Sequence, residues 1–396
     1  MSDLIIRPAT EADIPAIKRA DERSFHARMS DTEIADTLTL LPPERFLVAV
    51  DPQDGLVGVT AAYDMAVTLP GGAALPSPGV AWVSVPATHR RRGILRALMA
   101  GQLGGFVAQG LPLAMLTASH ASIYGRFGYG EATRNRCVEI DPRAELRADA
   151  PDPGGVRFAE TSEVTEHAPR IHRRWAARTP GAVSRSEAWW KRFFLDREYR
   201  RGGASSMFHL VHPDGWAAYR AKWGTEGSTL SVELFAVTPE AHAALWRVLL
   251  AQELVEKIST RLTFDDPLQL MLTDPRLIRT TSVADGLWLR VLDVPAVLGA
   301  RRYGCEIDVV LEVRDDFLGR GGRFRLQGGP DGASCTPTAG AAQVHVGMAD
   351  LGSLVTGNVR ARSLAAAARL QAEDAALARF DVAFVPEREP WHGTDF

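Results

Sequence analysis

The sequence predicts a mixed α/β and α+β protein with more than one domain. The chain has 396 residues, which suggests roughly two to four domains. Strand and helix patterns alternate along its first 140 residues, as is typical of a mixed α/β unit. The segment ADAPDPGG at 148–155 indicates a linker, and the pattern changes again near residue 291. We therefore expect domains at 1–150, 155–290 and 291–396.

The elements of the first domain follow in order. A strand is expected at 4–7, and then a helix that Thr10 begins as part of a capping box with Asp13. The turn DPQDG joins the strands of a predicted hairpin. Apolar residues at helical spacing predict a helix from Gly93, and Gly110 suits its C-terminal cap. The expected elements after the first helix are strands at 45–50, 55–64 and 80–85, a helix at 93–108, a strand at 111–117, a short helix at 123–127 and a strand at 137–140 that closes the unit.

The second and third domains show weaker patterns. The second is expected to hold strands at 208–211, 216–222 and 231–236 and a helix at 239–254. In the third, strands are predicted at 308–312 and 323–327, Asp350 is expected to cap a helix, and the alanine- and leucine-rich stretch 363–378 predicts another helix.

The second domain echoes the first. ELFAVTPEAHAALWRVLLAQ aligns with AWVSVPATHRRRGILRALMAGQ as strand, turn and apolar helix, but it lacks the arginines and the glycine of that turn. A duplicate of this kind would have lost what the first copy binds.

Composition excludes several classes. The net charge of −3 lacks the basic excess of a dedicated nucleic-acid binder, and no apolar run approaches the roughly 18 residues of a membrane span. The N-terminus has no signal-peptide pattern, so we expect a cytoplasmic protein without nucleic-acid or membrane partners. Cys137, Cys305 and Cys335 form no CxxC pair, so we expect buried inert thiols and no metal.

Three readings compete for the arginine turn, Arg90–Gly93: a solvated surface turn, a nucleic-acid contact, or an anion site. The net charge disfavours nucleic acid. A helix that begins near Gly93 leaves its first N–H groups unpaired at the positive end of its dipole, where an anion is stabilised. Glycine permits close approach of a phosphate, and arginine adds charge-assisted donors. The context favours a phosphate-bearing cofactor.

The arginine turn resembles the acetyl-CoA-binding turn of the GNAT N-acetyltransferases. That superfamily usually has glycine or alanine where this chain has Leu95. The departure fits one subgroup, because VSVPATHRRRGILRALM and TASHASIYGRFGYGEAT closely resemble the Eis acetyltransferases of actinobacteria. Further stretches, among them HPDGWAAYR, DPLQLMLTDPRLIRTT, DGLWLRVLDVPAVLGAR and CTPT, extend the resemblance over the whole chain.

The resemblance implies an architecture and an activity. It implies tandem GNAT domains, the second degenerate, a sterol-carrier-like C-terminal domain, and a homohexamer. Such enzymes acetylate amines of aminoglycosides at several positions, and some acetylate lysine side chains. By similarity, the pantetheine arm of acetyl-CoA would meet the backbone of Val83, Ser84 and Val85, and the pyrophosphate would meet Arg91, Arg92, Gly93, Ile94, Leu95 and Arg96. Ser119 and His120 would flank the cofactor, and Trp82 and Asp395 would face the substrate.

Acetyl transfer to an amine needs an oxyanion donor, which a strand amide near Val85 could supply, and an acid for the leaving thiolate. A tyrosine suits this acid, because the usual pKa values of a thiol and of tyrosine are about 8.5 and about 10. Tyr124 and Tyr129 are both candidates, and the resemblance selects Tyr124.

The base is less apparent, because no Asp or Glu lies in 80–85. The Eis family uses its C-terminal carboxylate, which Phe396 would supply here. An α-carboxyl has a pKa of about 3.3–3.7 and is ionised at neutral pH. It can therefore attract the substrate ammonium group, whose proton would leave through water. Burial would raise this pKa and make it a better base.

Some substrate positions depart from the best-known Eis proteins. In the stretch His26-Ala27-Arg28, Ala27 stands where those proteins carry an aspartate. Trp82 stands where they carry phenylalanine, and the chain ends Thr394-Asp395-Phe396 instead of Phe-Glu-Phe. We expect an acetyl-CoA-dependent N-acetyltransferase that transfers directly to aminoglycosides. The alternatives are a lysine or polyamine acetyltransferase and a non-enzymatic CoA-sensing carrier of apolar ligands.

Overall fold

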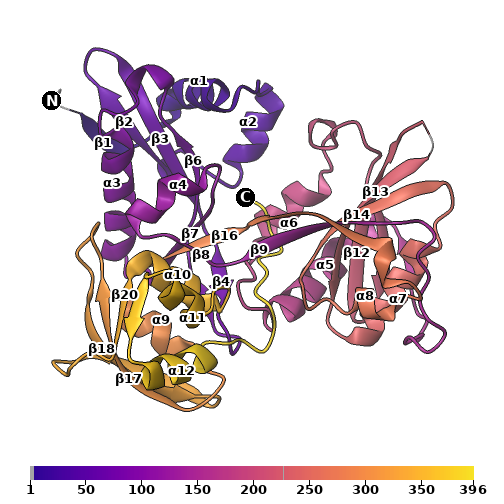
Figure 1. Cartoon of the computed structure of the whole chain (residues 1–396). Helices are drawn as coiled ribbons and strands as arrows, with labels where there is room; N and C mark the ends of the chain where they lie inside the picture. Colours follow the sequence, from indigo (N-terminus) through magenta and orange to yellow (C-terminus); the bar gives the residue numbers. More distant parts are fainter. Residues whose placement is uncertain (1–3, 226) are drawn as a thin grey trace. The chain divides into compact units, whose positions relative to one another are not determined.

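The computed structural model describes residues 4–225 and 227–396 (Figure 1). These residues form two compact units. The first holds residues up to 133, 180–183 and 285–396, and the second holds 134–179 and 184–284. Sheets of seven, seven and five strands carry most of the structure, and the mixed α/β and α+β prediction is confirmed.

The N-terminal part of the first unit is a seven-stranded sheet in the order β1-β2-β3-β6-β7-β16-β8. As predicted, the Asp13 carboxylate accepts the Thr10 N–H at the first helical turn, at 2.8 Å. The elements are β1 (Ile5–Pro8), α1 (Ile14–Phe25), α2 (Asp31–Leu38), β2 (Phe46–Asp51), β3 (Gly55–Tyr63), β4 (Ala66–Thr68), β5 (Ala74–Pro76), β6 (Gly79–Ser84), α3 (Ile94–Ala108), β7 (Leu113–Thr117), α4 (Ala121–Tyr124), the 3₁₀ turn η4 (Gly125–Phe127), β8 (Gly130–Glu131) and β16 (Leu287–Val291).

Helices α3 and α1 pack on opposite faces of this sheet (Figure 1). The α3 side chain of Gln102 accepts a hydrogen bond from the Thr60 hydroxyl at 3.0 Å. On β6, the Ser84 hydroxyl instead donates to the carbonyl of Ala20 on α1 at 3.1 Å. Ser84 pairs with Val59, the neighbour of Thr60, and successive residues of a strand face opposite sides. The sheet is therefore covered on both faces at β3 and β6.

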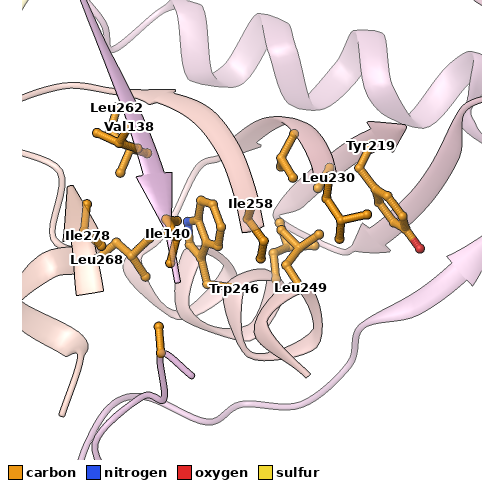
Figure 2. Packing of buried hydrophobic residues seen from close by; sticks show 14 of the residues in the cluster. Val138, Ile140, Tyr219, Leu230, Trp246, Leu249, Ile258, Leu262, Leu268 and Ile278 are labelled. Atoms are coloured by element: carbon orange, nitrogen blue, oxygen red, sulfur yellow. The ribbon is translucent and has the colours of Figure 1, made fainter. Parts of the chain in front are cut away.

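The second unit is a seven-stranded sheet in the order β10-β11-β12-β13-β14-β9-β15. Its core surrounds Trp246, which is fully buried beside Ile258 and Leu249 (Figure 2). The elements are β9 (Arg134–Ile140), β10 (Arg157–Ala159), α5 (Thr161–Ala176), α6 (Glu187–Phe194), β11 (Phe208–His212), β12 (Gly215–Trp223), β13 (Ser228–Ala236), α7 (Pro239–Leu250), β14 (Val255–Leu262), α8 (Leu268–Met271) and β15 (Ile278–Asp285).

One predicted strand belongs to a different sheet than expected. The strand predicted at 137–140 to close the first domain is β9, which pairs antiparallel with β14 of the second sheet. Its Val138 and Ile140 are fully buried in the core around Trp246. The place beside β7 is taken by β16, which arrives from much later in the chain. Local alternation predicts a strand but does not name its partner, which is why this assignment was wrong.

The C-terminal part of the first unit is a five-stranded sheet in the order β19-β18-β17-β20-β21 with helices packed on it. Its elements are α9 (Val294–Ala300), β17 (Ile307–Arg314), β18 (Gly322–Gly329), β19 (Gly332–Pro337), β20 (Val344–Gly347), α10 (Met348–Thr356), α11 (Ala361–Ala366), β21 (Leu370–Ala372) and α12 (Asp374–Ala383).

Two helix predictions in this part were wrong in detail. The helix predicted at 363–378 is interrupted, because Ala368 adopts a left-handed φ of 57° and β21 then pairs with β20. Sheet pairing here overrides the helical propensity of alanine. Asp350 does not cap a helix but lies in the first turn of α10, whose N-cap is Gly347.

The expectation of buried cysteines holds in part. Cys335 is buried, and burial raises the pKa of its thiol to about 12. Cys137 and Cys305 are only half-buried. Among the residues that the structure describes, no helix is long and apolar enough to cross a membrane, and no group of three or more His, Cys, Asp or Glu side chains could hold a metal ion.

Arg301 is fully buried where the last segment of the chain leaves the C-terminal sheet. Its Nε donates to the carbonyl of Val355 at 2.9 Å, and its Nη2 donates to the carbonyl of Phe384 at 2.6 Å. Burial lowers the pKa of Arg301 to about 10. The guanidinium thus ties the ends of α10 and α12 together, immediately before residues 386–396.

A buried ion pair joins β16 to the loop after β17. Arg290 Nη2 lies 2.6 Å from Asp315 Oδ2, and the two side chains are 0% and 1% exposed. Burial raises the pKa of Asp315, but the hydrogen bond and charge of Arg290 outweigh it and keep this pKa below its ordinary value. Water does not reach either charged group, so each charge is stabilised mainly by the other.

We expect Asp315→Asn to lower the free energy of unfolding by about 3–5 kcal/mol, because it leaves the Arg290 guanidinium buried without its counter-charge. Urea unfolding of the full chain measures this loss. Asp308→Asn is the matched control, because Asp308 pairs with Arg325 at 2.7 Å on the surface of the same sheet. Exposed pairs contribute about 0–1 kcal/mol. Equal losses in the two variants would contradict the prediction.

Candidate active site

The site is built where two parallel strands part. β6 and β7 pair at Gly79↔Met115 and Val80↔Leu116, although β6 continues to Ser84. The pairing of β6 with β3 also shifts register at this place, so β6 carries an extra residue there. A bulge leaves its extra residue outside the hydrogen-bond ladder. Backbone groups of β6 are therefore available for another partner beyond Val80.

Trp82 lies in this bulge with a left-handed φ of 58°, which is uncommon for a bulky residue. Its indole packs edge-on against Phe46 of β2, with the ring centroids 5.6 Å apart. Backbone conformations of this kind persist where the surrounding structure holds them, and they concentrate at functional sites. The bulge thus turns the backbone of Trp82 and Val83 out of the regular sheet.

The side chains of the three residues predicted to meet pantetheine are turned toward the protein. The Ser84 hydroxyl lies 2.6 Å from that of Ser24 on α1. Val83 and Val85 are half-buried against hydrophobic clusters of the same unit. The prediction that these residues meet the pantetheine arm through their backbone groups is compatible with these side-chain contacts and stays a prediction.

The arginine turn leads directly into α3. Gly93 is the N-cap residue with a φ of 80° and no side-chain cap. A Cβ on Gly93 would meet nothing within 4 Å, so the left-handed conformation, and not protein crowding, requires glycine here. Arg91 is exposed and also has a positive φ. Ile94 is buried and Leu95 half-buried, so these two present only their N–H groups.

Two arginines of the predicted phosphate site, Arg92 and Arg96, contact side chains of neighbouring segments. Arg92 Nη2 lies 3.3 Å from Asp51 Oδ2, and its Nη1 lies 3.7 Å from Asp54 Oδ2. The Arg96 guanidinium lies over the ring of Phe317, 5.1 Å from its centroid. These contacts limit the mobility of both side chains beside the open start of α3.

Tyr124 ends α4 and is only 5% exposed. Burial raises the pKa of its phenol, and a hydrogen bond with Ser119 partly opposes this. Tyr129 packs edge-on against Tyr124 with the centroids 6.1 Å apart, is fully buried, and has its pKa raised strongly by burial. His120 is exposed at the N-cap of α4. Of the two tyrosines, Tyr124 is therefore the one whose hydroxyl has a hydrogen-bond partner among the described residues.

The terminal segment, residues 391–396, brings Phe396 to the place where β6 and β7 part. One oxygen of its carboxylate accepts a hydrogen bond from Thr117 Oγ1 at 3.3 Å. The ring packs edge-on against Tyr63, 6.2 Å between centroids. A Cβ on Gly79 would come within 2.8 Å of Phe396 Cε2, so this glycine makes room for the ring.

The carboxylate contacts the short segment that carries the phenol. Thr117, which binds the Phe396 carboxylate, ends β7, and Tyr124 ends α4 directly afterwards. Ser119 lies between them and is hydrogen-bonded to Tyr124. The segment 117–124 thus binds a proton acceptor at its start and carries a proton donor at its end. Asp395, in contrast, has a side chain 62% exposed.

The strap 180–183 holds the terminal segment along its length. Trp391 N–H donates to the carbonyl of Pro180 at 2.9 Å, and Val183 N–H donates to that of His392 at 3.0 Å. The Thr394 hydroxyl donates to the carbonyl of Val183 at 3.3 Å. The same strap bridges to Val67 on β4. The terminal segment is thus bonded to the first unit well before it reaches Phe396.

Asp21 is a carboxylate near β6 that the sequence did not single out. It shares the inner face of α1 with Ala20 and Ser24, both bonded to the Ser84 hydroxyl. Burial, and then the charges of two neighbouring glutamates, raise the pKa of Asp21 to about 6. A carboxylate with such a pKa is suited to proton transfer at neutral pH.

Other contacts of the site were also missed. The sequence did contain a signal for Gly79, because an isolated glycine inside a strand often marks a place where another part of the protein approaches the backbone closely. Thr117 is the first polar residue after an apolar run. For Tyr63 and His392 no sequence signal exists, because their roles depend on contacts that only the fold brings about.

The second unit differs from the first at the corresponding strand and helix start. In the echo, Thr238 is the N-cap of α7, and its own hydroxyl accepts the Ala241 N–H at 3.2 Å. β12 and β13 pair over nine positions without a register shift. The bulge between β3 and β6 and the uncapped helix start thus have no counterpart in β12, β13 and α7. The sequence had predicted the loss of the arginines and the glycine from this turn, but not that of the bulge.

Comparison with known families divides the chain into three. Residues 5–132 and 181–291 each match an acetyltransferase (GNAT) domain, and residues 294–393 match a sterol carrier protein domain.

Named relatives match almost the whole chain. The N-acetyltransferase Eis of Mycobacterium tuberculosis is 40% identical over 390 residues, 96% of each chain. An uncharacterized N-acetyltransferase of Streptomyces coelicolor is 38% identical over 358 residues, 86% of each chain. The crystal structure of Eis1 from Mycobacterium abscessus superposes with a TM-score of 0.88 at 31% identity, covering 99% of this chain and 100% of that one.

Proposed function

The chain belongs to the Eis-type N-acetyltransferases of the GNAT superfamily, and on this premise we propose that it acetylates amines of aminoglycosides at several positions. It is an acetyl-transferring enzyme, so the non-enzymatic carrier that the sequence left open is set aside. GNAT enzymes use acetyl-CoA as the donor. The homohexamer stays a prediction.

The residues present fit acetyl-CoA. The start of α3 has no side-chain cap, open space lies beside Gly93, and Arg91 is exposed there. We assign the pyrophosphate to this helix start and to the arginine turn. The pantetheine arm would run along the backbone of Val83–Val85, beyond the point where β6 and β7 stop pairing.

The proposed reaction is a direct transfer. The substrate ammonium passes one proton through water held by the Phe396 carboxylate to solvent, and the neutral amine nitrogen then attacks the thioester carbon. A backbone N–H at the β6 bulge stabilises the negative oxygen that forms. As the carbon–sulfur bond breaks, the Tyr124 hydroxyl protonates the leaving thiolate. The nitrogen, acidic once the carbon–nitrogen bond has formed, releases its second proton to solvent, from which Tyr124 regains its own. No acyl-enzyme is needed, and the three cysteines lie on β9, on β19 and in the loop before β17.

The observation that carries this proposal is the position of Phe396. Its carboxylate is bonded to Thr117, at the start of the segment that ends in Tyr124. Asp395, exposed beside it, adds a second negative charge, which suits a polycationic substrate.

A specific observation favours a lysine side chain, from the alternative of lysine or polyamine substrates, as the second candidate. Where the best-known relatives carry an aspartate, this chain has the exposed stretch His26-Ala27-Arg28. Arg28 pairs with Glu22 at 3.2 Å, which neutralises one negative charge on α1. A weaker negative field would reduce the advantage of a substrate with many ammonium groups over a lysine side chain, which carries one.

Acetyl-CoA consumption with a panel of aminoglycosides, polyamines and lysine peptides tests the substrate class. We expect kcat/KM to be at least ~10-fold higher for aminoglycosides than for lysine peptides, because an aminoglycoside presents several ammonium groups to the two carboxylates and a lysine side chain presents one. Mass spectrometry of the products should show more than one acetyl group on each aminoglycoside. Tyr124→Phe supplies the background rate. Acetylation confined to lysine peptides or polyamines would replace the proposal with its alternative.

A further inference from the structure

His392 is a fully buried histidine in the terminal segment, four positions before Phe396. Its Nδ1 lies 2.9 Å from the hydroxyl of Thr133, the residue that follows β8 by two positions. The same hydroxyl accepts the N–H of Leu287, at the start of β16, at 2.8 Å. The imidazole is therefore joined to two strands of the N-terminal sheet through one threonine.

The Thr133 hydroxyl can serve either tautomer of the ring. A hydroxyl has one proton and two lone pairs. Leu287 N–H occupies one lone pair of Thr133, so the proton and the second lone pair remain for His392 Nδ1. Nε2 lies 3.5 Å from Asp395 Oδ1. The ring is thus bonded to the sheet through Nδ1 and faces the Asp395 carboxylate through Nε2.

The space for the ring also depends on the sheet. A Cβ on Gly286 would come within 2.7 Å of His392 Cε1 and 2.6 Å of Thr133 Oγ1, so only glycine leaves room for both. On the opposite side, the carbonyl of His392 accepts the N–H of Val183 from the strap. The side chain and the backbone of His392 are held by separate parts of the first unit.

The last two residues are less buried than those before them. Asp395 is exposed, and Phe396 is half-buried. A chain terminus loses conformational freedom when it docks, so their placement depends on buried residues upstream. Thr394, which is 1% exposed, contacts the strap, and the fully buried His392 contacts the N-terminal sheet through Thr133.

We propose that His392 is a positioning residue: its burial between Thr133 and Gly286 keeps the Phe396 carboxylate at Thr117 and directs Asp395 toward the acceptor amine. The catalytic part of this inference rests on the proposed function of Phe396. The docking part does not, because it concerns where the terminal segment lies.

Release of Phe396 by a carboxypeptidase that removes C-terminal aromatic residues measures docking directly. We expect the full-length wild type to release Phe396 slowly and His392→Ala to release it at least ~10-fold faster, as expected for a terminus that undocks more often. His392→Asn should restore protection, because its amide oxygen can accept from Thr133 in place of Nδ1. His345→Ala is the matched control, since His345 is half-exposed on the C-terminal sheet.

Kinetics separate the two parts of the inference. Misplacement of a catalytic group predicts that His392→Ala lowers kcat by ~10²-fold, with the KM for acetyl-CoA little changed and with recovery in His392→Asn. Faster release with unchanged kcat would support the docking role and contradict the catalytic role of Phe396. Release at the wild-type rate in His392→Ala, with thermal unfolding unchanged, would overturn the positioning role itself.

Discussion

Deletion of Phe396 is expected to lower kcat for amine acetylation by ~10²–10⁴-fold, the usual contribution of a general base. The deletion moves the terminal carboxylate to Asp395 and removes the ring that packs against Tyr63 and Gly79. Binding of acetyl-CoA should persist, because the arginine turn and the start of α3 are untouched. Steady-state kinetics and calorimetric titration with CoA measure the two effects.

Two controls separate the carboxylate from the ring. Phe396→Leu keeps the carboxylate and most of the apolar contact, so we expect it to retain activity. A variant extended by a few residues beyond Phe396 keeps the ring but converts its carboxylate into an amide, and we expect it to be inactive. Full activity of the extended variant would contradict the role of the carboxylate. If Asp21→Asn alone were inactive, the base would lie on α1 instead, where the pKa of Asp21 is about 6.

Elements with strong local signals could be predicted from the sequence. The helix from Gly93 combines helical apolar spacing with a glycine whose φ is 80°, and the capping box at Thr10 forms as expected. Predictions failed where a distant partner decides. β9 is a strand by its own alternation, but the core around Trp246 determines its sheet. Within the alanine-rich stretch 363–378, residues 370–372 pair with β20 and divide the predicted helix into α11 and α12.

The candidate site divides in the same way. The arginine turn was accessible because strand, glycine and helix are adjacent in sequence. Phe396 and Tyr124 came from the resemblance, and no spacing connects them, because Thr117 and Phe396 are 279 positions apart. The strap 180–183 and His392 are far apart in sequence, and only the fold brings them into contact. Sequence patterns report local geometry, so these contacts had to come from the fold.

Tyr124→Phe is expected to lower kcat by ~10²–10⁴-fold, because the thiolate would then leave without a proton from the enzyme. Burial raises the pKa of Tyr124, so its hydroxyl remains protonated through the neutral and mildly alkaline range. Tyr124 acts as an acid only while its hydroxyl is protonated. A raised pKa therefore moves the loss of activity at alkaline pH to higher pH. The wild type should therefore show no alkaline decline from Tyr124 below a pH of about 10, the ordinary tyrosine value.

Tyr129→Phe is the matched control for this prediction. Tyr129 packs against Tyr124 at 6.1 Å between centroids and is fully buried, so its loss tests the packing of the same segment without removing the proposed acid. We expect its kcat to stay within ~3-fold of the wild type and CoA affinity to be equal in both variants. The thiolate of a more acidic thiol is a weaker base and leaves more readily without a proton. An acetyl donor with a more acidic thiol should therefore increase kcat of Tyr124→Phe by a larger factor than kcat of the wild type. Equal losses in the two tyrosine variants, or the absence of this rescue, would contradict the assignment of Tyr124 as the acid.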